Sequence, residues 1–304
     1  QDAELIMPHI ANALSRAKAT DAWPGIAQFL ANPQFQQVGE LFENWDYSTP
    51  TGITEGYDPN DNPFDLRDPD STEVDNSIAA TVYAVWRSMA VQNTIDATID
   101  GIDAAIGAEF LGPQRPGSTL AFNAFKNLLD QYDSMQGYGA SGVNFFTNPA
   151  APNREDARDY VILASLQQAL EKLAGDDFAA AFGNSTDVRD YRWGMLHRIT
   201  FRHTLGGPLS VPNGHFGFST VEGLPGIARS GGYQTLDASS HSARASHDNA
   251  FTFAHGPARR FVAEMAPSGP LAEQIIPGGQ SGNISDGANY VNQLPYWLTN
   301  NYLP

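Results

Sequence analysis

The first two-thirds of the chain carries hydrophobic residues at the spacing of amphipathic helices. Apolar side chains recur every three or four positions, which places them on one face of a helix with polar residues opposite. This pattern predicts helices over residues 2–19, 34–44, 75 to about 110, 118–132 and 153–174. Pro8 lies inside the first range, so we expect that helix to begin near Pro8 or to bend there.

Short polar residues mark where two of these helices begin. We expect Asn76 or Ser77 to cap the third helix, because such side chains accept hydrogen bonds from the free N–H groups of a first turn. Asn153 has the same place before the last helix. Glu155 and Asp156 follow in its first turn, where negative charge interacts favourably with the helix dipole. The sequence therefore predicts a helix that begins directly after Asn153.

Residues 48–75 are of a different kind, with Asp, Asn and Glu interleaved with Pro59, Pro63 and Pro69. The composition predicts a long polar loop, and such loops in compact domains are usually functional or packed on a partner. Its carboxylate and amide oxygens are of the kind that bind calcium. Pro63 and Pro69 stand where an EF-hand loop needs its glycine and its bidentate glutamate. We therefore interpret the segment as a solvated, turn-rich loop.

The pattern changes after about residue 185, where glycines multiply and apolar runs become short. The runs that read as strands are 233–236, 250–253 and 260–265. A mainly helical part over 1–185, followed by a strand-rich part over 186–304, predicts an α+β fold. So few strands would leave exposed sheet edges, which folded proteins avoid. We expect the late strands to join a sheet supplied by other sequence, in one multi-chain domain rather than two independent domains.

Composition narrows the range of partners. The chain has 17 Lys and Arg against 34 Asp and Glu, a net charge of −17 at pH 7. This balance argues against a nucleic acid or an anionic membrane surface as partner. No apolar run approaches the length of a membrane span. The chain has no cysteine, which excludes a disulfide, a thiolate metal site and a cysteine nucleophile within it.

Histidine is unevenly distributed, with six of the seven residues between positions 197 and 255. They are His197, His203, His215, His241, His247 and His255. Imidazole is a common zinc ligand, so a His-ligated metallohydrolase is one alternative. The spacing gives neither a His-Glu-x-x-His motif nor two histidines four apart on a predicted helix. His197 and His203 serve equally well as core histidines that bind backbone carbonyl groups.

Five short blocks carry an ordered set of glycine, aromatic and charged residues. They are Trp45-Asp46 with 75–86, 193–197 with 201–203, 231–239, 259–265, and Pro-Gly-Gly-Gln-Ser-Gly-Asn at 277–283 with 292–298. In this order, the blocks resemble the C-terminal half of the catalytic chain of the penicillin acylase family of N-terminal-nucleophile hydrolases. Gly278, Gly279 and Gly282 have no Lys-Ser or Lys-Thr after them, which excludes a P-loop. Close approach of backbone segments explains these glycines.

The resemblance implies a fold and a reaction. The fold would be an αββα sandwich completed by companion chains of the same precursor, in the periplasm or outside the cell. The reaction would be hydrolysis of an acylated amine, such as a β-lactam side chain, an N-acyl homoserine lactone or a similar amide. An N-terminal Ser, Thr or Cys would form an acyl-enzyme, with its own amino group as base.

The resemblance also places the catalytic groups outside this chain. The nucleophile and the oxyanion hole lie upstream of the part that it resembles, and Gln1 cannot act as nucleophile. We therefore expect a processed product whose companion chain bears the nucleophile. The chemistry implied needs no cofactor, and the structural calcium of some family members would be bound mainly by the companion chain. A non-catalytic, acylase-like binding module is the alternative, and it would have no partner chain that begins with Ser, Thr or Cys.

Glu264 is the single catalytic candidate within the chain. In family members closest to cephalosporin acylases, the resemblance implies that an acidic residue at this place supports an active-site histidine. Glu264 would otherwise pair with Arg259 or Arg260, or face solvent. Substrate contacts are expected in the loop 215–229. The aromatic residues that would line an acyl pocket or fill the core are Trp86, Phe122, Phe125, Trp193, Phe216, Phe218 and Tyr233.

Overall fold

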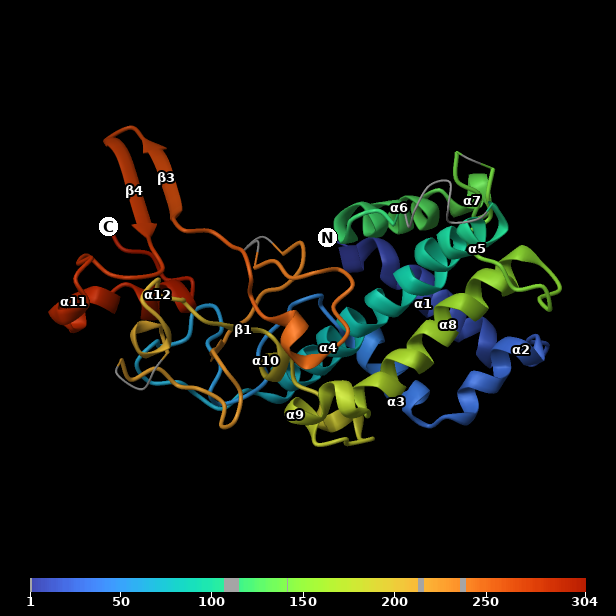
Figure 1. Ribbon diagram of the computed structural model, residues 1–304, viewed down its shortest axis with the longest axis horizontal. Coiled ribbons are helices and arrows are strands. Elements are labelled where there is room, and N and C mark those ends of the chain that lie inside the picture. The colour runs from blue at the N-terminus through green and yellow to red at the C-terminus, as the bar shows by residue number, and fades with distance from the viewer. Residues whose placement is uncertain (1, 107–114, 141, 213–215, 236–238) are drawn as a thin grey trace. The chain divides into compact units, whose positions relative to one another are not determined.

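A computed structural model of the chain describes residues 2–106, 115–140, 142–212, 216–235 and 239–304. Helices and strands are both present, as expected of an α+β protein (Figure 1). The chain divides into two compact units, and each is described by itself. Unit 1 comprises residues 1–47, 78–191 and 242–250, and unit 2 comprises residues 48–77, 192–241 and 251–304. None of the described helices is both long enough and apolar enough to cross a membrane.

Unit 1 is helical. Its described elements are α1 (Asp2–Lys18), α2 (Pro24–Ala27), η1 (Gln28–Ala31), α3 (Gln34–Asn44), most of α4 (Ser71–Val91), the π-helical η2 (Gln92–Asp96), α5 (Ala97–Ile106), α6 (Ser118–Asp130), α7 (Tyr132–Met135), α8 (Arg154–Leu173), η3 (Asp176–Phe178), α9 (Ala179–Phe182), η4 (Val188–Asp190) and most of η6 (Asp248–Phe251). The helices predicted over 2–19, 34–44, 118–132 and 153–174 are confirmed. Pro8 lies inside α1, and the predicted positions 107–110 lie outside the described residues.

The start of α4 is fixed by Asp70 and Glu73. The Asp70 carboxylate accepts hydrogen bonds from the N–H groups of Thr72 and Glu73, at 2.8 and 2.9 Å. The Glu73 carboxylate accepts the Asp70 N–H in return, at 2.9 Å, which completes a capping box. The prediction that Asn76 or Ser77 caps this helix is therefore wrong. The bonds between Asp70 and Glu73, further upstream, satisfy the first turn. Asn76 and Ser77 lie inside α4.

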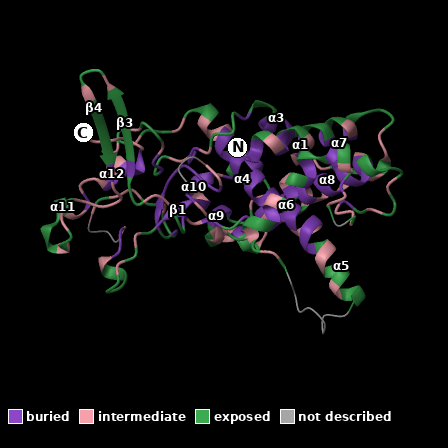
Figure 2. Ribbon diagram, turned by 90° about the horizontal axis from the view of Figure 1, so that it is seen from above, coloured by how far each residue is buried: buried purple, intermediate pink, exposed green. Residues whose placement is uncertain are grey.

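The start of α8 is as predicted. The Asn153 side chain accepts the Asp156 N–H at 2.8 Å, and Glu155 and Asp156 lie in the first turn. Helix α1 packs against α3, α6 and α8, and the buried faces of these helices form the core of unit 1 (Figure 2). Trp86 of α4 is buried completely and donates its indole N–H to the Ile162 carbonyl of α8 at 3.0 Å. A buried indole thus keeps its hydrogen bond while it contributes apolar contact.

Unit 2 has short elements joined by ordered loops. They are α10 (Trp193–Leu196), β1 (Arg198–Ile199), η5 (Gly207–Leu209), β2 (Ile227–Ala228), β3 (Arg260–Ala266), β4 (Gly269–Ile275), η7 (Ile284–Asp286), α11 (Ala288–Val291) and α12 (Leu294–Leu298). Strands β1 and β2 are antiparallel, as are β3 and β4. Trp297 of α12 is buried, with the guanidinium groups of Arg229 and Arg260 over its ring at 4.6 and 4.3 Å. These contacts hold the C-terminal segment on the core of unit 2.

One of the three predicted strands forms. The run 260–265 is β3, whereas the described part of 233–236 is a turn and 250–251 belong to η6. The Gly232 N–H donates to the hydroxyl oxygens of Thr235 and Ser239, at 3.2 and 2.6 Å. The turn forms because these side chains, and not a neighbouring strand, accept that N–H. Leu236 lies outside the described residues. The strand predictions at 233–235 and 250–253 are therefore wrong.

Candidate functional site

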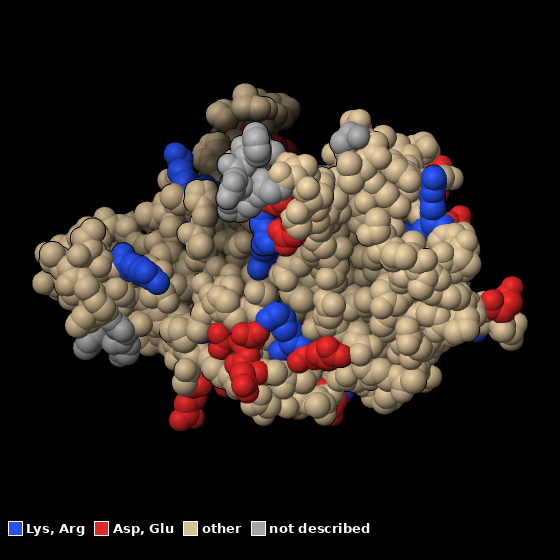
Figure 3. Space-filling model, turned by 45° about the vertical axis from the view of Figure 1, so that its right-hand side comes forward, with Lys and Arg blue, Asp and Glu red and all other residues tan. Residues whose placement is uncertain are grey.

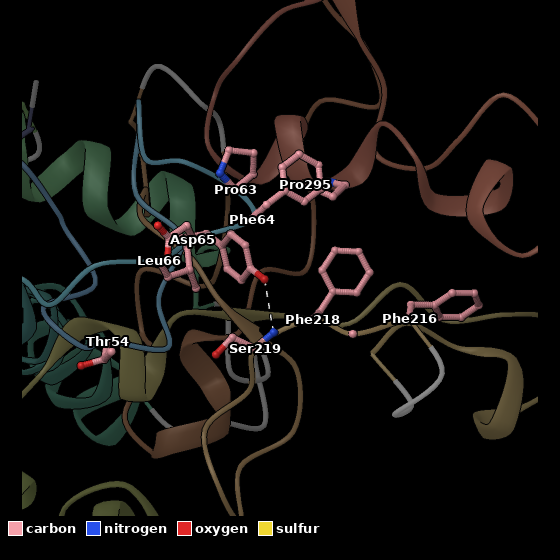
Figure 4. Close-up of a pocket in the computed structure, with 11 residues that line it drawn as sticks. Thr54, Pro63, Phe64, Asp65, Leu66, Phe216, Phe218, Ser219 and Pro295 are labelled. Carbon is pink, nitrogen blue, oxygen red and sulfur yellow. Dashed lines mark hydrogen bonds between the residues drawn. The ribbon is translucent and has the colours of Figure 1, made fainter.

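Unit 2 contains a pocket of about 440 Å³ with aromatic walls, which we call the aromatic pocket (Figure 4). One wall comes from the loop that precedes α4, with Tyr57 and Phe64, and the other from the segment Phe216–Ser219. Pro295, at the start of α12, completes the lining. The pocket lies within unit 2 and joins three segments that are far apart in the sequence.

Tyr57 is the fixed point of this pocket. Its N–H donates to the Ala228 carbonyl at 3.0 Å and its carbonyl accepts the Ser230 N–H at 3.2 Å, so the loop residue extends the edge of β2. Its phenol oxygen accepts the Ser219 N–H at 3.2 Å, the bond dashed in Figure 4. Burial raises the pKa of the Tyr57 phenol. The hydroxyl therefore stays protonated and retains an O–H that can donate to a ligand.

Phe64 and Phe216 give the pocket its apolar surface. The Phe64 ring is 69% exposed and meets Tyr296 edge to face, with ring centroids 5.5 Å apart. The Phe216 ring contacts Tyr290, with centroids 5.7 Å apart. The exposed Phe64 ring and the half-buried Phe216 ring, each in contact with a tyrosine ring, suit contact with an apolar ligand body.

In the loop that precedes α4, the carboxylates form hydrogen bonds and ion pairs with residues of the same segment. Asp58 accepts the N–H and the hydroxyl of Thr51, and its own N–H donates to Asp61 at 2.9 Å. Arg67 is paired with Glu73 and lies 3.5 Å from Asp61. Burial raises the pKa of Asp58 to about 6. The Asp/Pro-rich segment is thus an internally bonded loop rather than a purely solvated one.

Two of the histidines of unit 2, His197 and His241, lie together, with ring centroids 5.9 Å apart. His197 is buried, with Nδ1 2.9 Å from the Phe251 carbonyl and its ring stacked on Trp193. His241 is buried against the same tryptophan. Nδ1 of His203 accepts a backbone N–H on the surface. His215 lies outside the described residues, and within the described part of the chain no three His, Asp or Glu side chains gather in a way that could hold a metal ion.

Charged side chains do not form a single-sign surface on the face shown in Figure 3. Among the described residues in that view, Lys and Arg lie singly or in small groups, several of them beside Asp or Glu. Both signs of charge are therefore visible among the described residues of this view.

Comparison with known proteins assigns the family. The sequence model of the penicillin amidase family matches residues 2–304. The chain belongs to the penicillin amidase family. An acyl-homoserine lactone acylase, QuiP of Pseudomonas fluorescens (strain Pf0-1), is 28% identical over 193 residues. This match covers 64% of the chain and 20% of the length of that relative, so the relative is much longer than the part aligned. The resemblance read from the ordered blocks is thus confirmed.

The aromatic residues that were predicted to line an acyl pocket or to fill the core divide into two groups. Phe216 and Phe218 line the aromatic pocket. The others are buried within their units and lie outside its lining: Trp86, Phe122, Phe125, Trp193 and Tyr233. The predicted contact loop 215–229 supplies the segment Phe216–Ser219 to the pocket, and its contact with substrate stays a prediction. Sequence reasoning missed Tyr57 and Phe64, because both lie in a segment read as a polar loop.

Glu264 lies in β3, opposite Leu271 of β4, and its side chain faces solvent. No described residue forms an ion pair with it. Arg259 lies over the Phe261 ring at 5.1 Å, and Arg260 donates to the Trp297 carbonyl at 2.6 Å. Of the structural alternatives, exposure to solvent is therefore the one observed. The role of Glu264 in supporting a histidine of another chain stays a prediction.

Proposed function

We propose that this chain is the C-terminal part of the catalytic subunit of a penicillin amidase that hydrolyses an acylated amine. The observation that carries the proposal is the family match over residues 2–304. The relative named as an acyl-homoserine lactone acylase supports an N-acyl homoserine lactone or a similar amide as substrate. The protein acts in the periplasm or outside the cell. The proposal needs no cofactor, and it assigns structural calcium, where bound, to the companion chain.

The nucleophile of the proposal is an N-terminal Ser, Thr or Cys on a companion chain. It attacks the amide carbonyl, its α-amino group takes the proton, and the amine leaves with a proton to give an acyl-enzyme. Water then hydrolyses the ester or thioester and releases the acid. Within the aromatic pocket, the Thr54 hydroxyl donates a hydrogen bond to the Asp68 carboxylate at 2.7 Å. This hydroxyl is therefore engaged in a structural bond of the loop that precedes α4. The aromatic pocket is assigned to binding of the apolar acyl body.

The hairpin β3–β4 supports a fold completed by other sequence. In Figure 1 it projects from the rest of unit 2, and Figure 2 shows it mostly exposed. Phe261 and Met265 are 56% and 83% exposed. They lie on one face, and the register places only uncharged residues on it: Phe261, Ala263, Met265, Pro270, Ala272 and Gln274. An isolated two-stranded hairpin is marginally stable in water, and an exposed apolar face indicates an interaction surface.

One edge of the hairpin is free. Gln274 of β4 exchanges backbone hydrogen bonds with Leu303, at 2.8 and 3.0 Å, so the base of the outer edge of β4 is occupied. Along the outer edge of β3, no described backbone group forms a pairing bond. An exposed edge of this kind accepts another strand. We assign that strand, and the cover of the uncharged face, to the companion chain of an αββα sandwich.

The test of this function is amide hydrolysis by the purified native protein. N-hexanoyl homoserine lactone and N-phenylacetyl homoserine lactone are incubated with it, and the products are identified by mass spectrometry. The expected products are homoserine lactone and the free acid, with the lactone ring intact. Release of the ring-opened N-acyl homoserine alone would show lactone hydrolysis and would contradict an amidase.

A further inference from the structure

A second pocket of unit 2 lies against the glycine turn at residues 277–283. The proposed function assigns no role to this turn. The pocket has a volume of about 250 Å³, and we call it the glycine-turn pocket. Gly278, Gly279 and Ser281 line one side, and Phe201–His203 line another. The pocket shares none of its described lining residues with the aromatic pocket.

Hydrogen bonds hold both sides in place. The Gly278 carbonyl accepts the Gln293 N–H, and the Ser281 N–H donates to the Asn289 carbonyl, each at 3.0 Å. These bonds fix the turn on the α11–α12 segment. On the other side, the backbones of Phe201 and Val211 exchange hydrogen bonds at 2.8 and 3.0 Å. The pocket is thus formed before a ligand arrives, which lowers the entropic cost of binding.

The floor of the glycine-turn pocket is apolar. Val211, Val291 and Leu294 are 3%, 8% and 1% exposed, so they belong to the core and present a fixed surface. Tyr290 adds an aromatic wall. The volume suits a body of a few carbon atoms or a single ring rather than a long acyl chain.

The charge of the glycine-turn pocket is positive, in a chain with a net charge of −17. None of its described lining residues carries a carboxylate, and Arg202 supplies the one permanent charge among them. Arg202 is exposed and pairs with no described carboxylate. Nδ1 of His203 accepts the Leu205 N–H at 3.1 Å, so the proton of the neutral ring is on Nε2, which is a donor. A cation and a donor beside an apolar floor suit an amphipathic anion.

We propose that the glycine-turn pocket binds a small monocarboxylate with a short aliphatic or single-ring body. The carboxylate is held at Arg202, and the body lies on the floor formed by Val211, Val291 and Leu294. The inference does not rest on the proposed hydrolysis, because binding is measured without turnover. A failure of either one is therefore distinguishable from a failure of the other.

The test measures the binding of five probes to the native protein by calorimetry: hexanoate, phenylacetate, acetate, hexanamide and inorganic phosphate. Hexanoate and phenylacetate are expected to bind at least about tenfold more tightly than the other three. Acetate lacks the body, hexanamide lacks the charge, and phosphate cannot use the apolar floor. Amide resonances of Gly278 and Gly279 are expected to shift with hexanoate, which places the ligand at the turn.

Two arginine variants provide the matched comparison. Arg202→Gln is expected to weaken hexanoate binding at least about tenfold, and Arg202→Lys by less, because the charge remains. Arg259→Gln removes an exposed arginine outside both pockets and is expected to leave hexanoate affinity within about twofold of the wild type. The proposal is overturned if hexanoate does not bind, if hexanamide or phosphate binds as tightly as hexanoate, or if Arg202→Gln retains wild-type affinity.

Discussion

Asp58 and Thr51 are joined by hydrogen bonds from both donors of Thr51. The Thr51 N–H lies 2.9 Å from Asp58 Oδ1, and the Thr51 hydroxyl lies 2.5 Å from Asp58 Oδ2. Thr51 is buried completely, so its N–H needs this acceptor. Burial nevertheless raises the Asp58 pKa to about 6 from its ordinary value of 3.8, because the cost of desolvating the carboxylate outweighs these bonds.

The raised pKa predicts a loss of stability as the pH rises. Between pH 3.8 and about 6 the folded protein holds a proton on Asp58 that the unfolded chain has lost, so the free energy of unfolding falls across this window and stays lower above it. Asp58→Asn keeps an acceptor for the Thr51 N–H and removes the charge. We expect it to be more stable than the wild type at pH 8, by about 1–3 kcal/mol, and similar to it at pH 4.

Chemical denaturation at both pH values measures this difference. Asp58→Ala is the control, because it leaves the buried Thr51 N–H without its acceptor and should destabilise the protein at both pH values. An Asp58→Asn variant that is less stable than the wild type at pH 8 would contradict the account.

Gly278 and Gly279 are neighbours, but only Gly278 has room for a side chain. A Cβ at position 279 would lie 2.1 Å from the Asn289 carbonyl oxygen, whereas a Cβ at 278 meets nothing within 4 Å. Gly279→Ala should therefore lower the free energy of unfolding by about 2 kcal/mol or more, since backbone must move. Gly278→Ala should change it by less than about 0.5 kcal/mol. Equal stability of the two variants in thermal denaturation would refute the close backbone approach at Gly279.

The capping box at the start of α4 predicts a cost for its removal. Asp70→Ala leaves the N–H groups of Thr72 and Glu73 without their acceptor and should destabilise the protein by about 1 kcal/mol. Thr72→Ala, in the same turn, keeps that bond and should have little effect. Urea denaturation compares the two variants. If Asp70→Ala is as stable as Thr72→Ala, the Asp70 carboxylate does not stabilise the start of α4.

The aromatic pocket predicts an effect on substrate binding. Phe64 is 69% exposed, so Phe64→Ala should cost little stability while it removes apolar surface from the pocket. We expect KM for an N-acyl homoserine lactone to rise about fivefold or more, with kcat changed less. Leu120→Ala removes a similarly exposed apolar side chain, 67% exposed, from unit 1. If both variants show the same KM, the aromatic pocket does not bind the acyl body.

Several helices were predictable from the sequence, and the aromatic pocket was not. The cap at Asn153 and the apolar periodicity of α8 depend on residues within one helix. The start of α4 was misplaced because Asp70 and Glu73 satisfy each other within a segment that looked like a polar loop. The aromatic pocket depends on Tyr57 pairing with Arg229, which directly follows β2 and is far away in the sequence, and no local pattern reports such a contact.

The central claim is that this chain belongs to an amidase whose nucleophile lies on a companion chain. Intact mass and N-terminal sequencing of every polypeptide in the native protein, quenched during turnover of N-hexanoyl homoserine lactone, test it most directly. We expect a companion chain that begins with Ser, Thr or Cys and carries the hexanoyl group, with no adduct on residues 1–304. A hexanoyl adduct within residues 1–304, or hydrolysis by this chain with no companion present, would contradict the claim.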